Sequence, residues 1–451
     1  MSVREAFKAY DVRGRVPDEL NEQMASAVGA GFAELFHPRQ VIMGRDVRPS
    51  GGPLSEALAQ GLRASGVEVL DLGLCGTEEV YFATAHLGTG GGIMITASHN
   101  PPDYNGMKFV AEGASAVSAD TGLEALARWV EAHPLAGEGS TRAPLRAVNT
   151  RPEYVLHLLG LIDTGAIKPL RVVVNAGDGC AGPTFDALAA TLPLDVVRLA
   201  HEPDGRFPNG VPNPLLRENR AATARAVRKT GAALGIAWDG DFDRCFFFDE
   251  RGEFVEAYYL VGLLAEAFLR KHPGEKIIHD PRLVWNTLDI VHRLGGIPIE
   301  SKCGHAFIKD RMRRENAIYG GEMSAHHYFR DFFYCDSGMI PWLLLLELMS
   351  VTGARLSELV AARQRLFPVS GEINRKVRDS GAAMRRVEAH FADKAVAVSH
   401  PDGLSMEFDT WRFNLRPSNT EPLLRLNVES HGDAEIVSRQ VHDILRLLDQ
   451  T

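Results

Sequence analysis

The chain has 451 residues, which is long enough for several domains of ordinary size. Its 49 basic and 58 acidic residues give a net charge of −9, which argues against broad binding to nucleic acid or to an anionic membrane, although not against a local basic pocket. Five cysteines are scattered without a CxxC pair, so we expect reduced thiols, no zinc-type site and a cytoplasmic protein.

Neither the N-terminal stretch nor the most apolar run of the sequence indicates a membrane segment. The opening MSVREAFKAYDVRG has no apolar stretch of the kind found in secretory signals, so none is predicted. The most apolar run, MIPWLLLLELM at 339–349, is short and contains Pro341 and Glu347. We predict a core helix there rather than a membrane span.

Three successive stretches each read as strand, helix, strand, strand and then a polar loop. The loops follow GIMIT at Ser98, ALGIAWD at DGDFD (239–243), and AIYGG at EMSAHH (322–327). Short apolar runs alternating with helical periods are typical of α/β layers with parallel strands. Ligands bind beyond the carboxyl ends of such strands, so we expect all three loops to carry function.

The last part of the chain has a different pattern. Short strands with turns, such as WRFNLRPSN and LLRLNVES, precede a tail whose apolar residues fall on one helical face. This pattern predicts a small α+β domain. The predicted domains are 1–145 with the Ser98 loop, 146–248 with the aspartate loop, 249–364 with the EMSAHH loop, and 365–451 with the RPSN loop.

The strongest local signal is DGDFDR, in which Asp239, Asp241 and Asp243 alternate with other residues. If the backbone stays extended, a period of two puts the three carboxylates on one face. Adjacent carboxylates repel unless a cation or protons relieve them, and hard oxygen ligands suit Mg²⁺. A calcium-binding EF-hand loop is disfavoured because Arg244 stands where the sharp turn needs glycine. A solvated acidic turn stays open as an alternative.

Two further loops offer polar groups in clusters. RPSNTEPLLR (416–425) combines two arginines with hydroxyl and amide side chains, which suits a phosphate group. GGEMSAHH (320–327) combines a carboxylate, a hydroxyl and imidazoles, which suits the hydroxyls of a sugar. For each loop, an ordinary surface turn is the competing interpretation.

Two other signals do not decide a function by themselves. GDGCAG (177–182) formally matches a dinucleotide-binding GxGxxG, but the acidic residue expected after the next strand is not clearly placed. We favour a glycine-rich strand-to-helix turn there. Ser98 could be a hydrolase nucleophile or a turn residue, because no GxSxG elbow surrounds it and adjacent His99 does not guarantee a usable geometry.

Taken together, the segments resemble the α-D-phosphohexomutase family over nearly the whole chain. The resemblance rests on five motifs in family order. They are AYDVRG (9–14), TASHNP (96–101), DGDFDR (239–244), GEMSAH (321–326) and RPSNTEP (416–422). It implies an α/β protein of four domains around a central cleft, three with a common mixed α/β topology and a smaller α+β domain at the C-terminus. Ala325 stands where many relatives have glycine.

The resemblance also implies roles for individual residues. Those implied in phosphoryl transfer are Ser98, Arg13, His99, Lys108, Arg244 and His305. Those implied in substrate binding are Lys302, Gly304, Glu322, Ser324, His326, Arg282, Arg416, Ser418, Asn419, Thr420 and Arg425. One Mg²⁺ is implied on Asp239, Asp241 and Asp243, with phosphorylated Ser98 completing its ligands.

The implied reaction is the interconversion of mannose 6-phosphate and mannose 1-phosphate through a 1,6-bisphosphate, with glucose or mannose 1,6-bisphosphate as activator. Lys108 or His99 would handle the proton of the attacking hydroxyl, and a cationic neighbourhood would lower the pKa of the lysine. Glucose phosphates are an alternative substrate, and a metal-dependent sugar phosphatase or a non-catalytic sugar-phosphate binder is an alternative class. The partners expected are hexose phosphates, and neither nucleic acid nor a membrane. The resemblance also implies a role in supplying GDP-mannose.

Overall fold

A computed structural model describes residues 3–134, 143–418 and 423–449. The chain forms two compact units, each described below by itself. The first contains Met1–Phe254 and His326–Gly353, and the second contains Val255–Ala325 and Ala354–Thr451.

The first sheet of the first unit is mixed. Strand β2 lies parallel to β3 and β4, whereas β5 runs antiparallel to β4 and β1. In sheet order the strands are β1 (Val12–Arg15), β5 (Tyr104–Ala111), β4 (Gly91–Ile95), β2 (Gln40–Arg45), β3 (Glu68–Leu74) and β7 (Leu145–Ala147), with β6 (Ser115–Ala116) beside β5.

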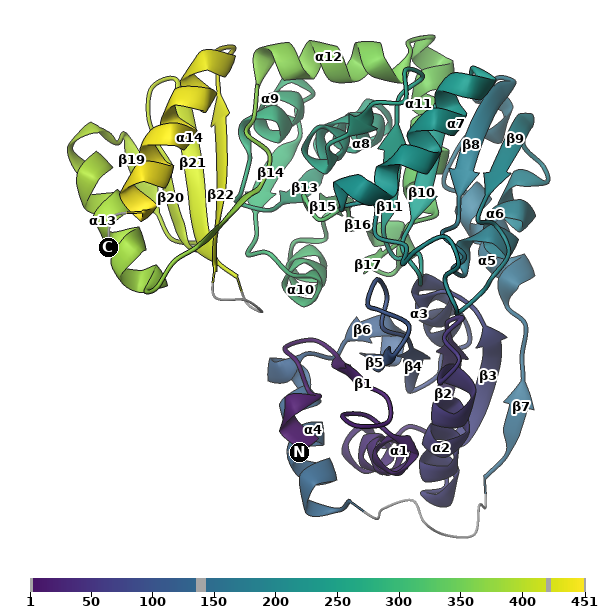
Figure 1. The fold of residues 1–451 in the computed structure, drawn as a ribbon. Helices are drawn as coiled ribbons and strands as arrows, with labels where there is room; N and C mark the ends of the chain where they lie inside the picture. Colours follow the sequence, from purple (N-terminus) through teal and green to yellow (C-terminus); the bar gives the residue numbers. More distant parts are fainter. Residues whose placement is uncertain (1–2, 135–142, 419–422, 450–451) are drawn as a thin grey trace. The chain divides into compact units, whose positions relative to one another are not determined.

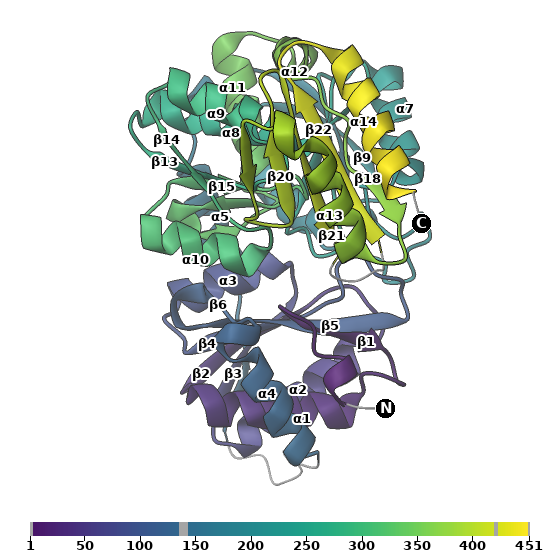
Figure 2. The same cartoon turned by 90° about the vertical axis from the view of Figure 1, so that its left-hand side faces the viewer.

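Helices cover both faces of this sheet. Helices α1 (Glu22–Phe36), α2 (Gly51–Ala64) and α4 (Leu123–Ala132) lie on one face, and α3 (Thr77–His86) lies on the other (Figure 2). Successive residues of a strand point to opposite faces, so Val41 packs with the first group and Ile42 packs with α3. Because both faces are buried, the central strands are almost wholly apolar.

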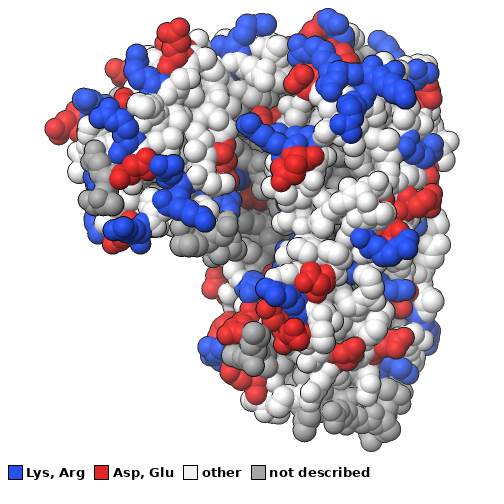
Figure 3. Space-filling view, viewed as in Figure 1, with Lys and Arg blue, Asp and Glu red and all other residues white. Residues whose placement is uncertain are grey.

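The second sheet of this unit is also mixed. Strand β10 (Leu234–Trp238) lies parallel to β8 (Leu170–Asn175) and antiparallel to β11 (Cys245–Phe248), while β9 (Leu194–Leu199) borders β8. The helices of this part are α5 (Arg151–Leu159), α6 (Ala181–Ala189) and α7 (Ala221–Thr230). Lys and Arg side chains gather over α7 in Figure 3, and Arg228 and Lys229 in its last turn suit the negative end of the helix dipole.

The later segment of the first unit adds helix α11 (Ile340–Thr352) and the antiparallel pair β16 (His327–Phe329) and β17 (Cys335–Asp336). Trp342 of α11 is fully buried against Phe185 of α6, with ring centroids 5.0 Å apart. The prediction of a core helix is therefore confirmed. Among the described residues, no helix has the length and apolar character needed to cross a membrane.

The second unit contains a parallel arrangement of β14 (Ile297–Glu300), β13 (Lys276–His279) and β15 (Tyr319–Gly321). The strand β12 (Phe254–Val255), which precedes it in the chain, is the edge strand next to β11 in the sheet that also contains β10, β8 and β9. Its helices are α8 (Ala257–Lys271), α9 (Trp285–Arg293), α10 (His305–Glu315) and α12 (Leu356–Leu366) (Figure 1).

The C-terminal part of the second unit is an antiparallel sheet with helices on one face. The strand order is β18 (Ile373–Lys376), β22 (Leu423–Ser430), β21 (Trp411–Pro417), β20 (Leu404–Glu407) and β19 (Ala397–Ser399). Helices α13 (Ser380–Phe391) and α14 (Ala434–Leu448) lie over this sheet in Figure 2 and bury Val387 and Ile444. The predicted class, three mixed α/β domains and a smaller α+β domain, is confirmed.

A buried ion pair joins the two parts of the second unit. Arg412 Nη1 donates to Glu429 Oε1 at 2.9 Å, and the Val284 backbone N–H donates to the same oxygen at 2.7 Å. The Tyr258 hydroxyl donates to the other oxygen of Glu429. Because this carboxylate is fully buried and saturated with donors, it fixes β22 against the start of α9.

Candidate active site

Ser98 lies three residues beyond the end of β4, in a turn with an unusual backbone. Its φ is 50°, in the left-handed region that costs a non-glycine residue about 1–3 kcal/mol. Its backbone N–H donates to Thr96 Oγ1 at 2.9 Å, and its side chain is 2 % exposed. The turn therefore holds one hydroxyl in a fixed, buried position.

Arg48, which Asp46 positions, fixes this turn by hydrogen bonds to its backbone. Arg48 donates to the carbonyl oxygens of Ser98 at 3.0 Å, Asn100 at 2.6 Å and Tyr104 at 2.8 Å. Asp46 in turn accepts from Arg48 Nε at 3.1 Å. The sequence analysis did not single out either residue, although both follow the carboxyl end of β2, which ends at Arg45.

The aspartate loop joins β10 to β11 by a tight turn. Phe242 has a φ of 46°, and its N–H donates to the Asp239 carbonyl at 3.1 Å. The backbone is therefore not extended, so the condition considered from the sequence is not met, and the three carboxylates converge because the chain turns. A Cβ at Gly240 would lie 2.6 Å from the Ser98 carbonyl oxygen, so glycine permits the two loops to touch.

Ser98, Asp239 and Arg244 form one hydrogen-bonded group. Ser98 Oγ donates to Asp239 Oδ2 at 2.7 Å and accepts from Arg244 Nη2 at 3.0 Å. Arg244 also donates to Asp239 Oδ2 from Nη2 at 2.6 Å and from Nε at 2.8 Å. The Arg244 guanidinium thus donates hydrogen bonds to both the Ser98 hydroxyl and the Asp239 carboxylate.

His99 and Arg13 lie beside this group. His99 Nδ1 is 3.0 Å from Ser98 Oγ and also contacts Arg244 Nη2. Burial, followed by the charges of Arg244 and Arg13, lowers the pKa of His99 well below its ordinary value, so the imidazole is neutral. Arg13 Nη1 donates to Asn100 Oδ1 at 2.7 Å.

Lys108 lies between two of the aspartates. Its Nζ donates to Asp241 Oδ2 at 2.6 Å and also to Asp243 Oδ2. Burial opposes the charged form, but the carboxylates of Asp241 and Asp243 outweigh it and raise the pKa of Lys108 above its ordinary value. The expectation of a lowered lysine pKa is therefore wrong here, because the nearest charges are negative.

The aspartate cluster fits a magnesium ion. One carboxylate oxygen from each of Asp239, Asp241 and Asp243 lies within 4.8 Å of the others, and all three residues are buried. Among the described residues, Asp241 Oδ1 and Asp243 Oδ1 have no hydrogen-bond partner. Thr77 Oγ1 holds the remaining oxygen of Asp241 at 2.5 Å. Buried carboxylate oxygens without donors are a donor set that suits Mg²⁺.

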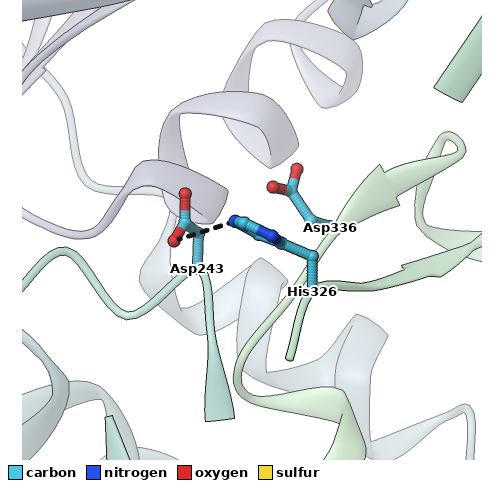
Figure 4. Close-up of side chains that lie close together, drawn as sticks. All are labelled: Asp243, His326 and Asp336. Carbon is cyan, nitrogen blue, oxygen red and sulfur yellow. Dashed lines mark ion pairs between the residues drawn. The ribbon is translucent and has the colours of Figure 1, made fainter. Parts of the chain in front are cut away.

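His326 faces the same cluster from its other side. Its Nε2 lies 3.8 Å from Asp243 Oδ1, and Asp336 lies next to the ring (Figure 4). The sequence analysis expected His326 in sugar binding and did not single out Asp336. The structure places both beside Asp243, and the role of His326 in sugar binding stays a prediction.

In the second unit, Glu322 lies on the loop that follows β15. Its Oε1 accepts from the Gly304 backbone N–H at 2.8 Å, which joins two of the predicted substrate-binding segments. His305 starts α10, Lys302 is exposed, with its Nζ 4.8 Å from the ring centroid of Phe307, and Ser324 is half-buried.

Asp280 positions Arg282 beside that loop. Arg282 Nη2 donates to Asp280 Oδ2 at 2.6 Å and Nε donates to Oδ1 at 3.1 Å. The backbone N–H of Met323 donates to Asp280 Oδ2 at 2.8 Å. One oxygen of Asp280 also lies within 4.8 Å of a ligand atom of Cys303 and of Glu322, but both Asp280 oxygens already accept hydrogen bonds from Arg282 and Met323.

Two arginines lie opposite each other on β21 and β22. Arg416 pairs in register with Arg425, and Glu372 lies 3.5 Å from the first and 3.2 Å from the second. Like charges opposite each other in a sheet repel, so this arrangement favours an anion. Ser418 Oγ accepts from Arg425 Nη2 at 3.3 Å. The predicted ligands Asn419 and Thr420 lie outside the described residues.

The GDGCAG loop has a packing role. A Cβ at Gly179 would lie 2.7 Å from the Gly240 carbonyl oxygen, and the Cys180 N–H donates to that oxygen at 3.0 Å. The glycines thus let this turn support the aspartate loop, in keeping with the structural interpretation.

Family models match the chain in four consecutive parts. Domains I, II and III of the phosphoglucomutase/phosphomannomutase family, each described as alpha/beta/alpha, match residues 4–132, 152–252 and 256–367, and the C-terminal domain matches 372–447. The chain belongs to this family. Its membership shows that the chain is a phosphohexomutase.

Full-length relatives agree with the family assignment. The chain is 59% identical over 443 residues to a protein of Xanthomonas campestris pv. campestris (strain B100) named "Phosphohexose mutases", covering 98% of this chain and 99% of that protein. It is 57% identical to the phosphomannomutase of Salmonella typhimurium, with coverage of 98% and 99%, and 55% identical to that of Escherichia coli K12, with the same coverage.

Solved structures show the same fold. A phosphoglucomutase/phosphomannomutase family protein from Burkholderia thailandensis superposes with a TM-score of 0.89 at 31% identity, covering 99% of this chain and 98% of that one. An N-acetylphosphoglucosamine mutase from Aspergillus fumigatus, solved with GlcNAc-6P and magnesium, has a TM-score of 0.60 at 13% identity, covering 99% and 98%. At that identity the likeness concerns the fold alone.

Proposed function

We propose that this phosphohexomutase is a phosphomannomutase, which interconverts mannose 6-phosphate and mannose 1-phosphate through a phosphorylated Ser98. The observation that carries the proposal is the environment of Ser98 Oγ, which is buried, 2.7 Å from Asp239 Oδ2 and 3.0 Å from Arg244 Nη2. A phosphoryl group on this oxygen would meet cations and hydrogen-bond donors that are already in place.

The transfer is a displacement at phosphorus. A sugar hydroxyl oxygen bonds to the phosphorus of phosphoserine, the bond from phosphorus to Ser98 Oγ breaks, and the hydroxyl proton passes to a base. Neutral His99, 3.0 Å from Ser98 Oγ, is a candidate for that base, and His305 is a candidate for the opposite substrate orientation. The 1,6-bisphosphate then returns its other phosphoryl group to Ser98.

Several cationic groups would stabilise the negative charge of the phosphoryl group during its transfer. Arg244 donates to Ser98 Oγ and would stabilise the oxygen from which phosphorus departs. The Lys108 ammonium, 2.6 Å from Asp241, and Arg13 supply further positive charge. Asp239, Asp241 and Asp243 would hold Mg²⁺, as the Aspergillus fumigatus mutase structure contains magnesium, and the bound ion would neutralise phosphoryl oxygens.

The second unit supplies groups suited to the parts of the substrate that do not react. We assign Arg416, Arg425 and Ser418, with Asn419 and Thr420, to the phosphate that is not transferred, and Arg282 to the same anionic substrate. Glu322, Ser324, Lys302 and Gly304 are assigned to sugar hydroxyls. Arginine forks recognise phosphate oxygens two at a time, whereas carboxylate and hydroxyl groups recognise sugar hydroxyls.

The preference for mannose rests on the names of the relatives, because mannose and glucose differ only in the orientation of one hydroxyl. The Salmonella and Escherichia relatives are named phosphomannomutases, whereas the Xanthomonas relatives carry the wider name. A dual phosphomannomutase/phosphoglucomutase is therefore the second candidate.

The test is a comparison of kcat/KM for mannose 1-phosphate and glucose 1-phosphate, with a catalytic amount of glucose 1,6-bisphosphate as activator. We expect the 6-phosphate isomer to form from mannose 1-phosphate with the higher kcat/KM. Equal values would establish the dual enzyme. Release of inorganic phosphate without isomer would instead indicate a phosphatase, and no reaction would contradict the proposal.

A further inference from the structure

A cavity of about 340 Å³ lies within the second unit, where its two parts face each other. One wall is formed by the carboxyl ends of β13 and β14 and by the start of α9, and the other by β19, β20 and β21. Its volume falls within the range of small-molecule sites, and ligands bind at the carboxyl ends of parallel strands. None of its lining residues is assigned to the reaction proposed above.

His279, the last residue of β13, lines this cavity with a ring nitrogen that has no partner. The residue is 4 % exposed, and its Nδ1 lies 3.1 Å from the carbonyl oxygen of Asp280. Because a carbonyl only accepts, Nδ1 carries a proton, and burial lowers the pKa of His279, so the ring is neutral and Nε2 keeps a lone pair. Among the described residues, no group donates to Nε2. A buried acceptor without a donor is costly, and an N–H or O–H group of a ligand would relieve it.

Two carboxylates, one on each wall, bring negative charge to the cavity. Glu300 pairs in register with His279 across β14 and β13, so the two side chains lie on the same face of their sheet. Glu407 lies opposite Arg412 on β20 and β21, on the face away from the core residue Leu404. Within the described part of the chain, neither carboxylate has an ion-pair or hydrogen-bond partner. Glu300 is exposed, so the cavity is open to solvent at that edge.

The positive charge that lines the cavity is already neutralised. Arg412 Nη1 lies 2.9 Å from Glu429 Oε1, and the guanidinium also donates to the carbonyl oxygens of Arg282 and Pro281, both at 3.1 Å. The described lining residues therefore offer two carboxylates without partners and no cation without one. This balance favours a positively charged ligand.

The spacing of these groups favours an organic cation over a metal ion. Three groups of His, Cys, Asp or Glu among the described residues bring their ligand atoms within 4.8 Å of one another, and His279, Glu300 and Glu407 are not one of them. Metal ligands lie about 2.0–2.6 Å from their ion, so ligand atoms much farther apart cannot share one. An aliphatic chain between two ammonium groups can instead reach both carboxylates. Apolar side chains are also part of the lining, namely Val284, Leu288 and Pro298.

We propose that this cavity binds an aliphatic diamine, whose ammonium groups pair with Glu300 and Glu407 and donate a hydrogen bond to His279 Nε2. The methylene groups of the diamine lie against the apolar lining. The site goes beyond the function proposed above, because no lining residue takes part in that reaction. An occupant joins the sheet whose loop carries Glu322 to the sheet that carries Arg416.

The test measures the binding of 1,4-diaminobutane and 1,6-diaminohexane to the full chain by calorimetry, in saturating Mg²⁺ so that ammonium groups do not enter the aspartate cluster. We expect one diamine per chain, and at least about 10-fold weaker binding of the diol of the same length, which lacks the charges. Glu407→Gln should weaken diamine binding by about 10-fold, and Glu300→Gln by up to about fivefold because its side chain is exposed. His279→Phe, which removes Nε2 and keeps an aromatic ring, should weaken it as well.

A matched control variant makes the result specific. Glu388→Gln removes the same charge from α13, where Glu388 lies 3.4 Å from His400, and it should bind diamines like the natural protein. Equal binding of diamine and diol, or natural affinity in both Glu300→Gln and Glu407→Gln, would overturn the proposal. No saturable binding at millimolar concentrations would also overturn it, because that is the behaviour of a gap filled by solvent alone. Glu300→Gln changes an exposed side chain and should fold, so the test stays decisive even if Glu407→Gln does not fold.

Discussion

The two units place their functional charges in opposite ways. In the first unit, cations and anions interlock, since Arg244 is bound to Asp239 and Lys108 to Asp241, and all four side chains are largely buried. In the second unit, Arg416 and Arg425 lie opposite each other and share the partly exposed Glu372 at 3.5 and 3.2 Å, and Asp402 lies 3.9 Å from Arg416. The arginine and lysine of the first arrangement are thus already hydrogen-bonded before a substrate arrives, whereas in the second Arg416 Nε and Arg425 Nε have no hydrogen-bond partner among the described residues.

This difference suggests different tasks for the two units. A charge network fixed in advance stabilises a transition state without reorganisation, so its loss should lower kcat. An arginine pair with unused donors can bind a phosphate that is the same in the ground state and the transition state, so its loss should raise KM. Substitutions in the first unit should therefore lower kcat, whereas substitutions in the second unit should raise KM.

The largest effect is expected from Ser98→Ala, which removes the oxygen that carries the phosphoryl group. We expect kcat to fall by at least about four orders of magnitude, because covalent catalysis has no substitute nucleophile in the cluster. Calorimetry should show a dissociation constant for mannose 1-phosphate within a few-fold of the natural value. Sustained turnover by this variant would rule out Ser98 as the nucleophile.

Removal of the metal should have the next largest effect. Exhaustive chelation should lower kcat by at least about 100-fold, since the uncompensated carboxylates would repel a phosphoryl group. Added Mg²⁺ should restore activity, and Asp241→Asn should need a higher Mg²⁺ concentration for the same recovery. Full activity in protein shown by elemental analysis to be metal-free would contradict the assignment of the aspartate cluster.

Arg416→Ala tests the second unit directly. We expect KM for mannose 1-phosphate to rise by about 10- to 100-fold, the range expected when a charge-assisted contact worth about 1.5–3 kcal/mol is lost, while kcat changes much less. Arg416→Lys should be intermediate, because an ammonium cannot bind two oxygens in a fork. A fall in kcat with an unchanged KM would show that the two units do not divide the tasks as proposed.

Glu372→Gln should have the smallest effect, and in the opposite direction. Glu372 lies 3.2 Å from Arg425 and 3.6 Å from Arg282, so a phosphate must compete with it for the arginines. Removing its charge while keeping its shape should lower KM by about two- to fivefold, as for a partly exposed ion pair. An increase in KM would indicate that Glu372 positions the arginines rather than competing for them.

The sequence predicted most of the fold because hydrophobic periodicity reports burial. The strands that end before Ser98 and Asp239 were predicted from short apolar runs, and their central positions are fully buried. Helix α13, a short helix with few buried residues, was not predicted. Periodicity could not reveal the turn of the aspartate loop. The positive φ of Phe242 that makes this turn cannot be read from a pattern of residue types.

The site was only partly predictable for a related reason. Motifs identify residues that are close in sequence, but Arg48 holds a turn 50 residues away and Asp336 lies beside Asp243 from a distant segment. The raised pKa of Lys108 likewise depends on carboxylates that are more than 130 residues away along the chain. Such contacts come from the tertiary structure, which the spacing of residues in one motif does not contain.

The most direct test of the account is to trap the phosphorylated chain. Protein incubated with hexose 1,6-bisphosphate carrying an isotopic label in its phosphoryl groups should acquire the label on Ser98, as located by tandem mass spectrometry. A chase with unlabelled mannose 1-phosphate should remove the label at a rate no slower than kcat. Label on a different residue, or a label on Ser98 that leaves more slowly than the enzyme turns over, would contradict the account.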